Sequence, residues 1–207
     1  MPNKAKTERS ERLTQRKSGG WATMSQNLLF VVSKLYSLSA EEAAIAQDQK
    51  HSRYIYAGLP LLLSAIYSFI VEYEGMLNPQ PLSADLLAKN GLAVLLEHRY
   101  GISGSLLEEF KDLTEIRNEI IHPIPLPVGT ADNWPDYLRR VKQQGLLCST
   151  GDPNADYLML SQMASHTLFK WAVGITERVY DAILNSDPTK APSYQRFGQA
   201  NFRTLFG

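Results

Sequence analysis

The chain has 207 residues, 44% of them hydrophobic, which is enough to bury a hydrophobic core. Its 21 basic and 21 acidic residues balance, so the chain as a whole carries no charge that would favour a polyanion. The single cysteine, Cys148, excludes an internal disulfide and a zinc site built from cysteines.

The N-terminal residues 1–20 differ from the rest, because six basic and two acidic side chains give them a net charge of +4. We expect either a disordered, solubilising tail or a tail that contacts nucleic acid. No apolar stretch follows these basic residues, so a secretory signal is not expected. The longest apolar-rich run, 59–71, is shorter than a membrane span. The sequence thus predicts a cytoplasmic chain that does not enter a membrane.

Helical periodicity recurs along the chain and strand signals are scarce, which predicts an all-α fold. The first helix is expected over 21–38. Ser39 and Glu42 have the spacing of a capping box and predict a second helix through Tyr56. Gly58 and Pro60 are expected to break or kink it. Residues 61–77 are apolar on nearly every side, as in the central helix of a bundle.

The next helix is expected over 83–100, interrupted or weakened at Asn90 and Gly91, and another helix begins near Ser105. Residues 123–156 are expected to form an irregular insertion with one short helix over 136–144, closed by Gly145, and a last long helix is expected over 156–184. We therefore expect one helical domain over 21–187. A C-terminal tail, 188–207, keeps three phenylalanines that pack back or meet a partner: Phe197, Phe202 and Phe206.

The helix that begins near Ser105 carries an arginine on its apolar stripe. At about 100° per residue, one arc holds the apolar residues Leu107, Phe110, Leu113, Ile116, Ile120 and Ile121. Acidic residues lie opposite and are expected to face water: Glu108, Asp112, Glu115 and Glu119. Arg117 falls near the middle of the apolar arc, and Asn118 and His122 lie four residues apart along its edge.

A guanidinium does not lose its proton, so burying Arg117 requires a carboxylate, a cleft or a bound anion. Glu72 and Glu74, near the end of the apolar helix, are the candidate internal partners, with Glu72 favoured. A buried Arg117–Glu72 ion pair that ties two helices together is one interpretation. A functional site for an anion is the other.

The histidine of this helix stands directly before Pro123, which predicts that the helix ends at or just before His122. A helix end favours a histidine, and an imidazole there can also give or take a proton. Arginine, asparagine and histidine at one helix end suit a phosphate group, because they supply fork-like donors, a neutral donor and a mobile proton.

The stretch "RNEIIHP", 117–123, resembles the R-N-x-x-x-H signature of HEPN domains. The order of helices around it also resembles that family, over roughly 25–184. The resemblance implies a small all-α bundle that forms a homodimer with two copies of the motif facing each other across a cleft. Many members of the family are metal-independent endoribonucleases of toxin–antitoxin and phage-defence systems, and others are not catalytic.

Other candidate residues carry weaker signals. His51, His98 and His166 show no metal-ligand spacing, and each is expected to be a surface or helix-packing residue. Three basic residues of the short helix form a patch that is either a solvated face or a weak RNA contact: Arg139, Arg140 and Lys142. No glycine-rich phosphate loop or other cofactor motif is visible, so neither a metal nor a cofactor is expected.

The leading hypothesis is a HEPN-type endoribonuclease that acts on RNA. In it, His122 moves a proton of the ribose 2′-hydroxyl or of the leaving oxygen, Arg117 stabilises charge at phosphorus, and Asn118 orients the motif or the phosphate. Glu72 would hold Arg117. The resemblance implies products with a 2′,3′-cyclic phosphate. Two alternatives remain: a non-catalytic HEPN module that binds RNA, a nucleotide or a protein at the same cleft, and a structural helical dimer. A toxin would have an antitoxin or other regulatory protein as partner.

Overall fold

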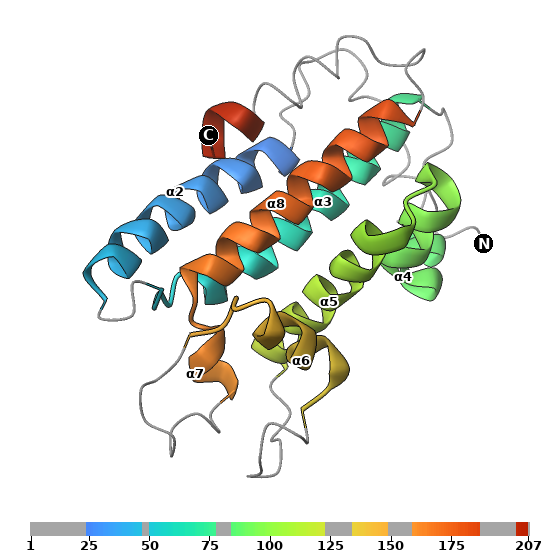
Figure 1. The fold of residues 1–207 in the computed structure, drawn as a ribbon. Helices are drawn as coiled ribbons and strands as arrows, with labels where there is room; N and C mark the ends of the chain where they lie inside the picture. The colour runs from blue at the N-terminus through green and yellow to red at the C-terminus, as the bar shows by residue number, and fades with distance from the viewer. Residues whose placement is uncertain are drawn as a thin grey trace, which may run out of the picture.

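A computed structural model describes residues 24–46, 50–77, 84–122, 134–148, 159–186 and 202–206. These residues form an all-α structure without a β-strand in the described ranges, apart from one isolated bridge between His51 and Ser165. The helices are α2 (Met24–Ile45), α3 (Ile55–Leu77), α4 (Ala84–Tyr100), α5 (Gly104–Ile121), α6 (Asp136–Gln143), α7 (Met159–Met163) and α8 (His166–Asn185) (Figure 1). A short helical segment covers 202–206.

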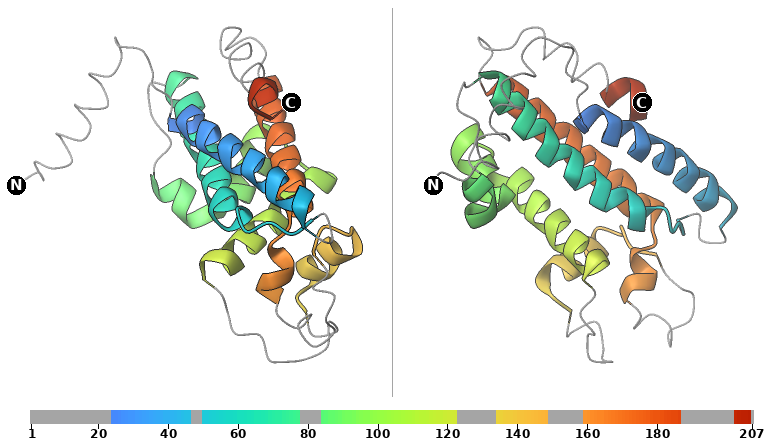
Figure 2. Two further views of the ribbon diagram at one scale, coloured as in Figure 1. Left: turned by 90° about the vertical axis from the view of Figure 1, so that its left-hand side faces the viewer. Right: turned by 180° about the vertical axis from the view of Figure 1, so that it is seen from behind.

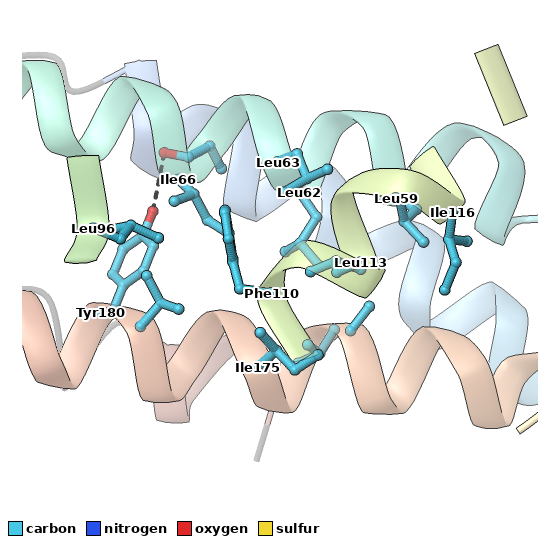
Figure 3. Close-up of a cluster of buried hydrophobic side chains, with 14 of the residues drawn as sticks. Leu59, Leu62, Leu63, Ile66, Leu96, Phe110, Leu113, Ile116, Ile175 and Tyr180 are labelled. Carbon is cyan, nitrogen blue, oxygen red and sulfur yellow. Dashed lines mark hydrogen bonds between the residues drawn. The ribbon is translucent and has the colours of Figure 1, made fainter. Parts of the chain in front are cut away.

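Three long helices form the centre of the bundle. The helices α2 and α3 pack along each other, and α8 lies against both. On the side of α3 and α8 away from α2 lies α5, with α4 beside its start and α6 beside its end (Figures 1 and 2). Apolar side chains of three helices meet between them, and Figure 3 shows Leu62 and Ile66 of α3, Phe110 and Leu113 of α5, and Ile175 of α8 in this core.

The central helix α3 begins earlier than expected and runs through Gly58 and Pro60. Of the two expected outcomes, a break or a kink at these residues, the break is wrong. Pro60 lies five residues after the start of α3 and past its first turn, because the N–H of Gly58 already donates to the Tyr54 carbonyl at 2.9 Å. Proline has no N–H to donate, so α3 continues without the bond from position 60 to the Tyr56 carbonyl. A Cβ at position 58 would lie 2.2 Å from Cζ of Phe169, so the glycine allows α8 to approach α3 closely.

The apolar stretch of α3 is also longer than the 59–71 run suggested. Residues Ile55–Glu74 are long and apolar enough, by length and composition alone, to cross a membrane. Half of this stretch is buried inside the bundle, as in the core helix of a helical bundle. The carboxylate of Glu74 at its end is buried and bonded to Arg99 and Tyr100.

The predicted capping box at Ser39 is wrong, because α2 continues from Met24 to Ile45 without a break. Ser39 is fully buried, and its hydroxyl lies 3.0 Å from Nδ1 of His166 in α8. The Glu42 carboxylate accepts a hydrogen bond from the backbone N–H of Arg53, 2.9 Å away, just before α3. Both side chains thus serve contacts between helices, which the local spacing could not indicate.

The last predicted helix is divided into α7 and α8 by Ala164 and Ser165. The Ser165 hydroxyl caps α8 by accepting from the backbone N–H of Leu168, and it donates to the Leu146 carbonyl at 2.6 Å. Two of the C-terminal phenylalanines pack back onto the bundle. Phe202 contacts Tyr180, and Phe206 contacts Tyr36, with ring centroids 5.8 and 5.7 Å apart.

Several boundaries agree with the sequence. The helix α4 has a non-helical residue at Gly91, with a φ of 67°, and α6 is followed by Gly145 at a φ of 70°. The α5 boundaries confirm a helix that ends before His122. Residues 1–20, most of the insertion 123–156 and Phe197 lie outside the described residues, as does most of the tail 188–207.

Candidate functional site

The candidate site lies at the C-terminal end of α5. His122 is the first residue after the helix, and its backbone N–H donates to the Asn118 carbonyl at 2.7 Å. Its backbone has left the helical conformation, with φ −128° and ψ 66°. Because a residue before proline avoids the helical region, Pro123 explains why α5 ends here.

Arg117 is the unusual residue of this site. Its side chain is half-buried, and Nη1 donates to Oδ1 of Asn118 at 3.1 Å. Its Nε is buried without a hydrogen-bond partner. Within the described residues, no carboxylate forms an ion pair with this guanidinium. A half-buried guanidinium without a carboxylate partner among the described residues is costly unless an anion approaches it.

The predicted ion pair between Arg117 and Glu72 is therefore wrong. The Glu72 carboxylate accepts from the backbone N–H of Ser25 at 3.1 Å and from the Ser25 hydroxyl. The helices α3 and α5 run antiparallel, and Ile116 meets Leu59 at the start of α3 (Figure 3). Thirteen residues separate Leu59 from Glu72, so the carboxylate lies about 20 Å further along the helix axis.

Glu74 does not pair with Arg117 either. One carboxylate oxygen accepts from Nε of Arg99 at 3.0 Å and from the Tyr100 hydroxyl at 2.8 Å. Burial and the neighbouring Glu74 carboxylate raise the pKa of Tyr100 well above its ordinary value. Both glutamates stabilise the end of the bundle opposite the candidate site.

The acidic side of α5 was expected to face water, and this is wrong for two of its four residues. Asp112 and Glu119 are only 4% and 8% exposed, because α6 packs over them. The Asp112 carboxylate accepts from Nε of Arg140 at 2.9 Å in a two-point contact. Oε1 of Glu119 accepts from the Tyr137 hydroxyl at 2.8 Å, whereas Oε2 is buried without a partner.

This cover also changes the interpretation of the basic patch on α6. Arg140 binds Asp112, Arg139 binds Asp136 on its own helix, and Nζ of Lys142 lies 4.7 Å from the ring centroid of Trp134. All three side chains have intramolecular partners, which favours a structural role for the patch over the weak RNA contact.

Sequence reasoning missed Tyr137, which holds the last turns of α5 through Glu119. Burial and the Glu119 carboxylate raise the pKa of the Tyr137 phenol above its ordinary value. The only available signal was the apolar face of the short helix, where Leu138 and Val141 are buried. That pattern predicts a packed helix but does not identify the surface it covers.

The side chain of His122 is exposed, as is the neighbouring Ile121. The Cα of His122 directly follows the last helical residue, so it lies about 140° around the axis from the Cα of Arg117. The exposed imidazole and the half-buried guanidinium therefore start from different sides of the helix end. Arg117 points along the apolar arc of α5, and His122 lies on its solvent side. A single copy therefore presents the two groups to different sides of the helix end.

Of the other histidines, His98 is exposed at the end of α4, whereas His166 packs between helices. His166 lies at the start of α8, with its ring centroid 4.9 Å from that of Tyr36. Burial of the imidazole and, to a smaller extent, the positive charge of Lys170 lower the pKa of His166. This agrees with a helix-packing histidine. Among the described residues, no group of three histidine, cysteine or acidic side chains is arranged to hold a metal ion.

Comparison of the chain with protein-family models, with curated proteins and with solved structures found no match.

Proposed function

We propose that the chain is a metal-independent endoribonuclease of the HEPN type, built as a single HEPN-like helical domain. It acts as a homodimer in the cytoplasm, without entering a membrane, and serves as a toxin or defence protein controlled by an antitoxin or other regulatory partner. Its substrate is RNA, and its site consists of Arg117, Asn118 and His122 at the end of α5.

One observation carries this proposal: the half-buried Arg117 has no carboxylate partner among the described residues, and its Nε is buried without an acceptor. An RNA phosphate supplies the missing negative charge. The Asn118 amide accepts from Nη1 and so orients the guanidinium. Asn118 therefore acts as a positioning residue for Arg117.

The divergence of Arg117 and His122 supports a site shared by two copies. If α5 of one copy faces α5 of the other about a two-fold axis, Arg117 of one copy and His122 of the other can address one phosphate. The exposed Ile121 beside them would be covered in the same contact. Each dimer then contains two equivalent sites.

The reaction that fits these groups is attack by the ribose 2′-oxygen. His122 takes the 2′-hydroxyl proton, the 2′-oxygen bonds to phosphorus, and the bond from phosphorus to the 5′-oxygen breaks. The leaving 5′-oxygen receives a proton either from the protonated His122 of the same site or from water. Arg117 stabilises the negative charge that develops on the phosphoryl oxygens. The products are a 2′,3′-cyclic phosphate and a 5′-hydroxyl.

The test is cleavage of single-stranded RNA and transfer RNA in the presence of EDTA, with the product ends identified. Arg117→Ala and His122→Ala should each lower the rate by roughly 10²- to 10⁴-fold. His98→Ala is the matched control, because His98 is an exposed histidine at the end of α4. RNA binding without cleavage by the wild-type chain would instead favour a non-catalytic binding module.

A further inference from the structure

The helix α2 carries two apolar lines: one is buried in the core, and the other is only partly covered by it. The inner line contains Leu29, Val32 and Ala43 and packs against α3 and α8. Each residue of the second line is offset by about one position from the inner line. Successive residues of the second line are four and three positions apart in turn as far as Leu38, and Ile45 follows seven positions later. We call it the α2 seam: Met24, Leu28, Val31, Leu35, Leu38 and Ile45.

The α2 seam is largely open to solvent in the part of the chain that the structure describes. Met24, Val31, Leu38 and Ile45 are between 40 and 86% exposed, and Leu28 and Leu35 are partly buried against the core. Position 42 continues the spacing, but its glutamate bonds to the Arg53 backbone. Four large exposed apolar side chains in register along 22 residues therefore form a stripe on one helix, interrupted at Glu42.

Steps of four and three residues are the spacing of a coiled-coil seam, in which each apolar side chain fits between those of a facing helix. We propose that the α2 seam binds the α2 seam of a second copy of this chain, with the two helices antiparallel about a two-fold axis. Leu35 then meets Leu38 of the partner subunit. The symmetry repeats this contact on the other side of the axis.

Charge at the edge of the seam selects the partner and the direction. Lys34 and Glu41, both exposed, lie seven residues apart along one edge, and neither has an ion-pair partner within the described residues. When Leu35 meets Leu38 of the partner subunit in the antiparallel arrangement, Lys34 lies beside Glu41 of the partner subunit, twice by symmetry. In a parallel arrangement Lys34 would face Ser39, which is buried and uncharged.

This contact is separate from the proposed catalytic pairing. The helix α5 lies on the other side of α3 and α8 from α2 (Figures 1 and 2), so pairing through α2 does not bring two Arg117 side chains together. A chain that uses both contacts assembles beyond a dimer. Loss of the α2 contact should therefore remove one association step and leave RNA cleavage unchanged.

Charge reversal tests the arrangement by sedimentation of the full chain. Lys34→Glu places two pairs of like charges across the contact and should weaken association roughly tenfold. Adding Glu41→Lys restores both pairs and should restore wild-type association. A double variant that associates no better than Lys34→Glu, or a Lys34→Glu variant that associates like wild type, overturns the antiparallel arrangement.

Truncation of the seam tests the surface itself. Leu38→Ala should weaken this association step by about 10²-fold, because both copies lose a central side chain. Val94→Ala on α4 is the matched control, since Val94 is equally exposed but lies outside the seam, and it should have no effect. A wild-type chain that stays monomeric at about 100 μM, or a Leu38→Ala variant that associates like wild type, overturns the proposal. A Leu38→Ala variant that associates like wild type would overturn only the α2 contact and would not affect the proposed α5 pairing.

Discussion

Two helical glycines in this chain should respond in opposite directions to the same substitution. Gly58 in α3 and Gly174 in α8 both lie inside long helices. Replacing a helical glycine with alanine commonly stabilises a protein by about 0.5–1 kcal/mol, because the unfolded chain loses freedom. At Gly174 no atom lies within 4 Å of the new Cβ, so Gly174→Ala should give this full gain.

At Gly58 the same Cβ would lie 2.2 Å from Cζ and 2.7 Å from Cε1 of Phe169, a ring that is fully buried. Overpacking of this kind costs about 1–3 kcal/mol or more, which exceeds the alanine gain. We expect Gly58→Ala to lower the free energy of unfolding by about 1–2 kcal/mol.

Urea denaturation of both variants measures the difference. A second substitution, Phe169→Leu, shortens the clashing ring, so it should destabilise the Gly58→Ala chain less than it destabilises wild type. Equal stabilisation by Gly58→Ala and Gly174→Ala would refute the close approach of α3 and α8 on which the core geometry depends.

Three further predictions concern buried polar contacts. Glu74→Ala should lower the free energy of unfolding by about 2 kcal/mol, because it leaves the buried Tyr100 hydroxyl without its acceptor. Glu72→Ala should lower it by only about 1 kcal/mol. Equal losses in urea denaturation would contradict this order. Tyr137→Phe should cost about 1–3 kcal/mol, because it leaves the buried Glu119 carboxylate without its donor, and an unchanged melting temperature would contradict the α6 cover. The pKa of His166 is lowered from 6.5 in the folded chain, so the unfolded chain binds more protons and stability should fall as pH drops below about 6.5. Wild type should therefore lose more free energy of unfolding between pH 7.5 and pH 5.5 than His166→Gln does. Equal losses in the two proteins would contradict the burial of the imidazole.

The sequence predicted features that depend on local chemistry. The all-α class, the break at Gly91, the short helix closed by Gly145 and the end of α5 before Pro123 follow from helical periodicity and from the backbone preferences of glycine and proline. The position of Arg117 on the apolar arc of α5 also followed from a helical wheel, and the buried Nε agrees with it.

Features that depend on the direction of neighbouring helices could not be predicted in this way. Glu72 is a plausible partner for Arg117 by residue type, but α3 and α5 run antiparallel and separate the two side chains. The helical wheel places the Asp112 carboxylate on the solvent side, but in the structure α6 covers it and Arg140 donates to it. A helical wheel describes one helix and contains no information on which helix covers its polar side.

The most direct test of the proposed shared site is a mixture of two inactive variants. In the proposed dimer, each site takes Arg117 from one copy and His122 from the other. A dimer of one Arg117→Ala chain and one His122→Ala chain therefore keeps one intact site of two. Random pairing of an equal mixture makes half of the dimers mixed, so about one quarter of the wild-type RNA cleavage should return. If the mixture stays as inactive as its separate components after the copies have exchanged, the two-copy site is contradicted.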